Sequence, residues 1–420
     1  MKVLMLGWEF PPYFAGGVGV VCYHLSKALC QAGAELTFVM PTAPKEARSD
    51  FMKMIVADRY EFDESLSVNM RFVDSLITPY GTEEEYKRNY DKYITSIIKN
   101  NKESYSQLYG ANLLEEIWLF AMRMRFFDFA SEGYDLIHAH DWTTFPAAIE
   151  LKKMLKKPVA VHIHITEYDK NGGFAGNPRI HEVEQYGMDN ADVIVAISNK
   201  IKQTCIEKYH QDPNKIVVIH NGAEEYPIIS MVKTDMKQIE ADDKIVLFAG
   251  RVTLQKGPEY FIDACAKVAP HVKNAKFILA GTGDLLPMCM DKVSRMGLSN
   301  RFMFTGFYTK ETAIKLFNMA DIFIMPSVSE PFGLVPFEAM WANTPTIISK
   351  QSGVSEVLNH CVKVDFWDTD KMADAIINIL NDKTLNNMLV KHGKVEVESM
   401  TWDTVAQKCL TLYNQMVVRH

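Results

Sequence analysis

The length, composition and charge of the chain exclude several classes of protein. It has 420 residues, of which 48% are hydrophobic and 23% charged, an ordinary globular mixture long enough for two α/β domains. Its 45 basic and 52 acidic side chains give a formal net charge of −7, which argues against the strongly basic face of a nucleic-acid binder.

Targeting and redox signals are weak. The start, Met1 to Trp8, is a short apolar run that Glu9 and two prolines end, so neither a signal peptide nor a transmembrane segment is predicted. The seven cysteines are odd in number and form no C-x-x-C pair, which favours reduced thiols. We therefore expect a cytoplasmic protein.

Short, nearly continuous apolar runs alternate with helix-length segments such as Val20–Ala32 and Pro146–Leu155 in the first half of the chain. This alternation is typical of buried strands in a parallel sheet. The predicted strands are Lys2–Leu6, Leu36–Met40, Leu136–Ala139, Val159–Ile163, Val193–Ile197 and Ile216–Ile219.

The same rhythm restarts after a polar stretch that ends at Lys244. The second set of predicted strands is Ile245–Ala249, Lys276–Ala280, Phe302–Thr305, Ile322–Met325 and Thr346–Ile348. The fold class is therefore α/β, with two Rossmann-like doubly wound domains that face one cleft. We expect one domain over residues 1–225, a second over 240–395 and a terminal helical segment over 396–420.

Residues 79–112 depart from this rhythm and hold six of the seventeen tyrosines. Tyr86, Tyr90 and Tyr93 follow helical spacing, so an inserted helix is predicted that enlarges the first domain. Packing of its aromatic stripe on the sheet is favoured over a sugar-stacking role. At the end of the chain, a stripe from Val405 to Met416 predicts a helix that docks on another element.

A glycine-rich loop, Gly16-Gly17-Val18-Gly19, separates the first strand from a helix. Glycines allow backbone N–H groups to approach a phosphate or a sugar closely. Alone this is a weak signal, and it is not the G-x-G-x-x-G fingerprint of dinucleotide-binding proteins, which argues against a nicotinamide-dependent oxidoreductase.

Two cations, Arg251 and Lys256, follow the first strand of the second half and are bracketed by Gly250 and Gly257. A pair of cations at the carboxyl end of a strand suits a diphosphate. Solvated surface charges are the simpler interpretation of a lone arginine or lysine, but the bracketing glycines weigh against it.

The segment from Glu330 to Met340 follows a later strand of the second half. Gly333 and Leu334 fall at a predicted helix start, where free N–H groups bind an anion. Glu330 in the loop and Glu338 one turn into the helix place carboxylates on either side, which suits the hydroxyls of a sugar nucleotide. A capping Glu330 and a surface Glu338 are the alternative, but it leaves a glutamate unexplained on an apolar helix face.

Two H-x-H elements end predicted strands, His138/His140 and His162/His164. Residues two apart on a strand share a face, so a metal site has to be considered. No further carboxylate falls at metal-ligand spacing beyond Asp141, and core or cleft histidines are favoured over a metal site. A D-x-D element also resembles a metal–diphosphate motif, but its Asp370 is better interpreted as a helix N-cap.

Taken together, these motifs resemble the retaining glycosyltransferases of the GT-B fold, in the group of glycogen and starch synthases and related hexosyltransferases. The resemblance covers nearly the whole chain. The motifs that carry it are the Glu330-x7-Glu338 element, the Arg251 to Lys256 element and the Gly16-Gly17 loop. It implies an enzyme whose second domain binds a nucleotide sugar and whose first domain binds a glycan acceptor.

The resemblance also implies the roles of the donor-side residues. Arg251 and Lys256 would hold the diphosphate, Glu330 the hydroxyls of the transferred sugar and Glu338 the ribose, with Tyr308 beside the base. The remaining expected donor-binding residues are Gly16, Gly17, Phe332, Gly333 and Leu334. No metal or other cofactor is expected, because the two cations supply the positive charge at the diphosphate.

His164 matches a strand-end histidine near the donor sugar and is expected to be catalytic with Arg251, Lys256 and Glu330. On the acceptor side, His140, Asp141 and Trp142 resemble the His-Asp-Trp segment of glycogen synthases. The implied function is an α-glucan synthase that uses ADP-glucose or UDP-glucose.

One departure leaves alternatives open. Phe14 and Ala15 stand where bacterial glycogen and starch synthases carry Lys-Thr. A hexosyltransferase for a small or cell-surface glycan acceptor is therefore an alternative, a nucleotide-sugar 2-epimerase is a further one, and a non-catalytic sugar-binding module is the last.

Overall fold

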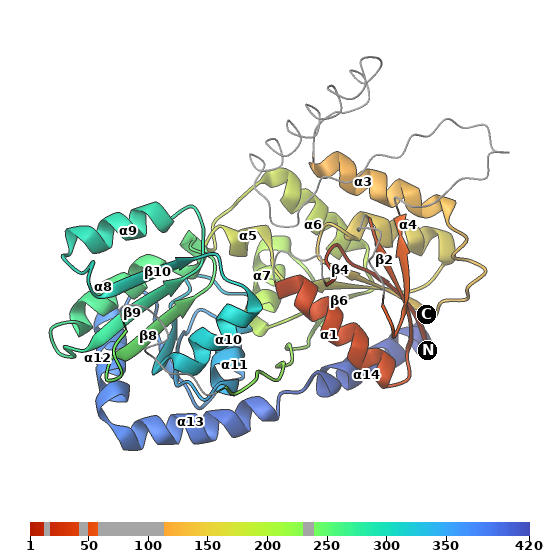
Figure 1. The fold of residues 1–420 in the computed structure, drawn as a ribbon. Coiled ribbons are helices and arrows are strands. Elements are labelled where there is room, and N and C mark those ends of the chain that lie inside the picture. The colour runs from red at the N-terminus through yellow and green to blue at the C-terminus, as the bar shows by residue number, and fades with distance from the viewer. Residues whose placement is uncertain (12–16, 42–48, 58–112, 230–238) are drawn as a thin grey trace, which may run out of the picture.

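The computed structural model describes residues 1–11, 17–41, 49–57, 113–229 and 239–420, and these form two parallel sheets flanked by helices (Figure 1). The first sheet has seven strands in the order β3-β2-β1-β4-β5-β6-β7, and the second has six in the order β10-β9-β8-β11-β12-β13. In both sheets the order reverses beside the first strand, which is the switch point where doubly wound sheets bind ligands. The predicted α/β class with two doubly wound sheets is confirmed.

The elements of the first half build one sheet and the helices around it. Its strands are β1 (Lys2–Leu6), β2 (Glu35–Met40), β3 (Lys53–Val56), β4 (Leu136–His140), β5 (Val159–Ile163), β6 (Val193–Ala196) and β7 (Ile216–Val218). Its described helices are α1 (Gly17–Gln31), α3 (Leu113–Arg123), α4 (Phe145–Leu155), α5 (Glu167–Lys170), α6 (Pro178–Asn190) and α7 (Asn199–Tyr209).

The second half repeats the pattern and ends in three helices. Its strands are β8 (Lys244–Ala249), β9 (Ala275–Ala280), β10 (Phe302–Gly306), β11 (Ile322–Met325), β12 (Thr346–Ser349) and β13 (Val362–Val364). Its helices are α8 (Pro258–Val268), α9 (Leu286–Arg295), α10 (Lys310–Met319), α11 (Val335–Trp341), α12 (Thr369–Asn381), α13 (Lys383–Glu398) and α14 (Trp402–Arg419).

Every strand expected from the apolar runs is present, while β3 and β13 were missed. Strands such as β4 and β5 are buried at every position, because helices cover both faces of the sheet. β3 is only four residues long and lies partly exposed at the sheet edge, and β13 has only three residues. Runs this short carry too little hydrophobic periodicity to be separated from a loop.

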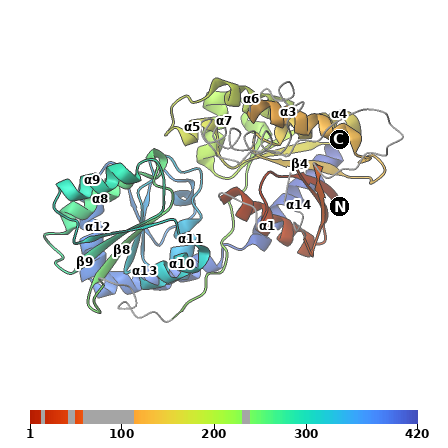
Figure 2. The same ribbon diagram turned by 45° about the horizontal axis from the view of Figure 1, so that its top comes forward.

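The chain passes between the two halves twice, and the two passages lie side by side (Figure 2). The backbone N–H of Ala223 donates to the carbonyl of Met400 at 2.7 Å. A β-carbon at Gly222 would lie 2.9 Å from the backbone nitrogen of Trp402, so only glycine fits there. After this point α14 packs on α1, which confirms the predicted docking of the Val405–Met416 stripe.

One prediction from the sequence is wrong, and several are not tested by the structure. The predicted N-cap Asp370 is wrong: Asp368 caps α12, because its side chain accepts from the backbone N–H of Lys371, and Asp370 lies in the first turn. The predicted insertion 79–112 and the loop residues Phe14, Ala15 and Gly16 lie outside the described residues. The domain limits at 225, 240 and 395 stay predictions.

Candidate active site

The loops after β8 and β11 bring Lys256 and Glu330 together at the carboxyl ends of two adjacent parallel strands. The ammonium of Lys256 forms an ion pair with Oε2 of Glu330, and the hydroxyl of Ser327 donates to the same oxygen at 3.3 Å. Both side chains are largely withdrawn from solvent, with exposed fractions of 18% and 8%. A cation and a carboxylate are therefore held in fixed positions at the edge of the second sheet.

The glycine after Lys256 sets how closely these two loops approach. Gly257 has a φ of +64°, and a β-carbon there would lie 2.2 Å from the carbonyl oxygen of Pro326. A side chain at this position would push the β8 loop away from the β11 loop and separate Lys256 from Glu330. Arg251 lies exposed at the start of the same β8 loop.

The start of α11 borders this ion pair. Gly333 has a φ of +99°, and a β-carbon on it would lie 3.1 Å from Cγ of Glu330. Phe332 is buried, with its ring 5.7 Å from that of Phe337. A β-carbon at Gly17 would lie 3.9 Å from Cδ1 of Leu334, so the start of α1 in the first half meets the start of α11 in the second.

Glu338 lies in the first turn of α11, beside Tyr226 and Tyr308. Burial, reinforced by the charge of Glu224, raises the pKa of Glu338 to about 7. Burial and then the charge of Glu338 raise the pKa of Tyr308. The structure thus brings the two predicted residues together and adds Tyr226, which sequence reasoning missed.

Glu224 lies near the Glu338 carboxylate and contacts side chains from both halves of the molecule. It accepts a hydrogen bond from Lys310 at 2.7 Å and lies 3.3 Å from Nε2 of His24 on α1. Burial alone would raise the pKa of Glu224, but these two partners lower it to about 2. Nothing in the sequence spacing indicated this network, because its members come from α1, the connecting segment and α10.

The predicted strand-end histidines form one buried group at the carboxyl ends of β4 and β5. Nδ1 of His140 lies 2.9 Å from Nε2 of His164, and Nε2 of His138 lies 3.2 Å from Nδ1 of His162. Burial lowers the pKa of His138 and of His164 to about 3, and it lowers the pKa of the other two as well. All four imidazoles are therefore neutral at physiological pH.

Asp141 and Trp142 follow directly after this group. Asp141 has a φ of +57°, and its Oδ1 accepts hydrogen bonds from the backbone N–H of His164 at 2.7 Å and of Ile165 at 3.4 Å. Trp142 is buried, with the ammonium of Lys170 5.3 Å from its ring centroid. The predicted His-Asp-Trp segment and His164 thus form one structural unit.

The first turn of α7 connects the first half to the Glu330 loop, and sequence reasoning missed it. The hydroxyl of Ser198, the N-cap of α7, donates to the carbonyl of Pro331 at 2.7 Å. The ammonium of Lys200 donates to Ser329 at 2.8 Å and to Asp169 at 2.5 Å. The residues on either side of Glu330 are therefore hydrogen-bonded to helices of the first half.

Glu356 completes this connection from the second half. Its carboxylate accepts from the backbone N–H groups of Asn199 at 2.8 Å and Lys200 at 2.9 Å, and from His220 at 2.9 Å. A carboxylate at a helix N-terminus is favoured by the free N–H groups and the helix dipole. The capping serine after a buried strand was a readable signal, but its partners more than 100 residues away were not.

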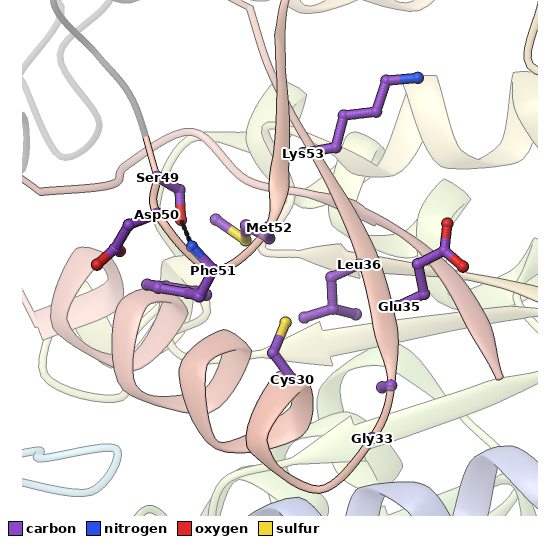
Figure 3. A pocket seen from close by; sticks show the side chains of 10 residues that line it. Cys30, Gly33, Glu35, Leu36, Ser49, Asp50, Phe51, Met52 and Lys53 are labelled. Atoms are coloured by element: carbon purple, nitrogen blue, oxygen red, sulfur yellow. Dashed lines mark hydrogen bonds between the residues drawn. The ribbon is translucent and has the colours of Figure 1, made fainter.

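A cavity of about 520 Å³ lies elsewhere, between the end of α1 and strands β2 and β3 (Figure 3). It is lined by residues such as Cys30, Leu36 and Phe51 and opens at the amino ends of the strands. The candidate site residues occupy the opposite, carboxyl edge, which is where ligands of doubly wound sheets bind.

In the described ranges no helix combines the length and apolarity of a membrane span.

Two family models match the chain: Glycosyltransferase Family 4 over residues 15–225, half of the sequence, and glycosyl transferases group 1 over residues 232–396. An uncharacterized glycosyltransferase of Methanocaldococcus jannaschii is 27% identical to it, covering 98% of both chains. A glycogen synthase of Mycobacterium tuberculosis is 24% identical, covering 98% of this chain and 94% of its own.

Solved structures of low sequence identity share the fold. A sucrose-phosphate synthase from Thermosynechococcus elongatus matches over all of both chains with a TM-score of 0.71 at 19% identity. Anabaena HepE, solved in complex with UDP-glucose, matches over 99% of this chain and all of its own with a TM-score of 0.67 at 18% identity. The chain therefore belongs to the group 1 and family 4 glycosyltransferases, and it is an enzyme with the GT-B fold.

Proposed function

We propose that the chain is a retaining hexosyltransferase that moves glucose from a nucleoside-diphosphate sugar to a growing α-glucan, as glycogen-type synthases do. The observation that carries this proposal is the Lys256–Glu330 pair beside the start of α11. An ammonium matches a phosphate oxygen, and a carboxylate accepts from sugar hydroxyls, so a sugar diphosphate fits this pair better than a phosphate or a sugar alone.

The donor fits the surroundings of this pair. Arg251 and Lys256 hold the diphosphate, together with the free N–H groups at Gly333 and Leu334. Glu338 accepts from the ribose hydroxyls, and Tyr308 lies by the base. The UDP-glucose bound to Anabaena HepE and the glycogen synthase among the relatives support UDP-glucose or ADP-glucose as the donor.

Transfer breaks the bond between the anomeric carbon and a β-phosphate oxygen. Negative charge develops on the β-phosphate, and fixed cations and N–H groups directed at it lower the barrier. The acceptor oxygen bonds to the anomeric carbon on the face that the diphosphate leaves, and its proton passes to that phosphate. Glu330 binds hydroxyls in this scheme and forms no covalent bond.

The acceptor lies on the first-sheet side in this proposal, toward His140, Asp141 and Trp142, with His164 next to the donor sugar. The first half thus holds the acceptor and the second half the donor. Because Arg251 and Lys256 supply positive charge at the diphosphate, the proposed transfer runs without a metal ion there.

A labelled-donor assay tests the proposal. UDP-[14C]glucose and ADP-[14C]glucose are incubated with the protein and glycogen, and the polymer is then digested with an α-specific glucosidase. We expect label in the polymer, released as glucose by that enzyme. A donor that epimerises without an acceptor, or a donor left intact with every acceptor, contradicts the proposal.

A second candidate is transfer to a small or cell-surface glycan acceptor. Phe14 and Ala15 favour it, because this loop lacks the cation that starch-synthase-type loops offer. The same assay separates the two: label in a small soluble product, with none in the polymer, selects the second candidate.

A further inference from the structure

The histidine cluster, defined as His138, His140, His162 and His164, holds more imidazole nitrogens than its hydrogen bonds use. His140 lies directly opposite His162 in the register of β4 and β5, and His138 precedes His140 on the same face. The centroid of the His162 ring lies 5.2 Å from that of each of them. All four residues are at most 5% exposed.

Several ring nitrogens of the histidine cluster have no hydrogen-bond partner. Nδ1 of His138 is hydrogen-bonded to the hydroxyl of Tyr413 on α14, and its Nε2 faces Nδ1 of His162 at 3.2 Å. Whichever ring nitrogens carry the protons in these two hydrogen bonds, Nε2 of His162 has no partner. Nε2 of His140 and Nδ1 of His164 are buried and without a hydrogen bond as well. Buried polar atoms are normally satisfied, so three in one cluster require an explanation.

We propose that His138, His140 and His162 form a binding site for one divalent transition-metal ion, with Zn²⁺ as the first candidate. One nitrogen from each of the three residues can be chosen so that all lie within 4.8 Å of one another. A tetrahedral zinc ion with bonds of about 2.0–2.1 Å separates its ligand nitrogens by about 3.4 Å. The 3.2 Å between Nε2 of His138 and Nδ1 of His162 already matches that spacing. His140 offers its unpartnered Nε2 as the third ligand, because its Nδ1 is hydrogen-bonded to His164.

The surroundings of the three rings fit a metal site. Tyr413 occupies Nδ1 of His138 and orients that ring, as outer-shell partners of metal-bound histidines do, which leaves Nε2 as the ligand. The buried carboxylate of Asp141, held at the backbone of His164, supplies negative charge close to the cluster. A set of imidazoles without oxygen or thiolate ligands favours Zn²⁺ over Mg²⁺ or Ca²⁺.

The proposed metal site lies in the first sheet and involves neither Lys256 nor Glu330. It shares His140 with the proposed acceptor side, and His140 is hydrogen-bonded to His164. Since Tyr413 belongs to α14, a metal here ties the C-terminal helix to β4 and β5. Metal binding is therefore expected to stabilise the first half of the molecule.

The full chain is stripped with a chelator and titrated with ZnCl2 against a competing indicator, with MgCl2 in parallel. We expect one Zn²⁺ per chain and no saturable Mg²⁺ binding. At free Zn²⁺ 100-fold above the Kd, the unfolding midpoint should rise by about 2–4 °C for a chain of this length. Co²⁺ in place of Zn²⁺ should give the visible absorption of a tetrahedral nitrogen site.

Variants locate the site. His162→Phe should abolish the stoichiometric binding, and Tyr413→Phe, which keeps the ring that packs in the core, should weaken it by about 10–100-fold. The control is His392→Gln, which removes an exposed histidine stacked on His360. Absence of saturable Zn²⁺ binding to the wild type, equal affinity in Tyr413→Phe, or loss of binding in the control overturns the proposal.

Discussion

At the carboxyl end of the second sheet a lysine and a glutamate form an ion pair, whereas at the same end of the first sheet four neutral imidazoles are buried beside the carboxylate of Asp141. Lys256 and Glu330 form an ion pair on the second sheet. On the first sheet, burial lowers the pKa of His138 and His164 to about 3. The ion pair lies at the switch point between β8 and β11, and the imidazoles lie on β4 and β5, next to the switch point between β1 and β4. The topology therefore fixes the place of a site but leaves its chemistry to the loop and strand-end residues.

The difference matches the two proposed substrates. A nucleoside diphosphate is an anion and needs positive potential, although the chain as a whole carries a net charge of −7. The loop after β8 and the start of α11 concentrate that potential locally. A glycan acceptor is uncharged and needs hydrogen-bonding groups.

Lys256→Met removes the central cation and leaves the Glu330 carboxylate without its ion pair. We expect kcat/KM to fall by about 10²–10³-fold, in the range seen when one group that stabilises developing charge is lost. Steady-state kinetics of nucleoside-diphosphate release measure it. The control, Lys350→Met, breaks an exposed ion pair with Asp365 in the same half and should change the rate by less than about fivefold. Equal losses in the two variants would refute the assignment.

His164→Asn removes one neutral imidazole from the first sheet. We expect kcat/KM to fall by about 10–100-fold, since a buried hydroxyl of the reacting sugar is left without its hydrogen-bond partner. The Kd for the nucleoside diphosphate, measured by calorimetry, should stay within about twofold of the wild type. A large loss of nucleotide affinity would place charge recognition on the first sheet as well.

Ser198→Ala removes the hydrogen bond from α7 to the carbonyl of Pro331. If this contact positions the Glu330 loop, kcat should fall by about 2–10-fold, the equivalent of one net hydrogen bond. Thr204→Ala is the matched control, because its hydroxyl bonds only within α7. A change in unfolding midpoint with no change in kcat would give Ser198 a purely structural role.

Glu338→Gln has the smallest expected effect and a defined pH dependence. Burial raises the pKa of Glu338 to about 7, so the folded protein holds this proton in a pH range where the unfolded chain has lost it. Wild-type stability therefore falls as the pH rises from about 4.5 to 7, and the glutamine variant escapes this loss. Its midpoint should gain about 1–4 °C relative to the wild type between pH 5 and pH 8.

The control for this effect is Glu311→Gln, which changes an exposed glutamate in the first turn of α10. Its midpoint relative to the wild type should not vary with pH over the same range. A glutamine variant at position 338 whose relative midpoint falls with rising pH would mean that the folded state favours the ionised carboxylate.

The two sheets could be predicted from the sequence, and so could the placement of Lys256 and Glu330 at the edge of the second sheet. Lys256 and Glu330 each follow a buried apolar run, and parallel strands place such loops at one edge. Glu338 was recognisable as a charge on an apolar helix face. These signals are local, because each depends only on a strand or helix and the residues next to it.

Contacts between the halves could not be predicted. Ser198 and Pro331 are separated by 133 positions, and their hydrogen bond depends on how two sheets are placed against each other. The i, i+2 spacing predicted that His138 and His140 share a face, but their approach to His162 required β4 and β5 to be neighbours in the sheet. These contacts depend on tertiary packing, and no local sequence pattern indicates them.

The most direct test of the central claim is the binding of UDP and ADP, measured by titration calorimetry, to the wild type, Lys256→Met and His164→Asn. The division between a charged donor side and a neutral acceptor side predicts at least a tenfold weaker Kd for Lys256→Met and an unchanged Kd for His164→Asn. Nucleotide binding that is insensitive to Lys256, or that is lost in His164→Asn, would contradict it.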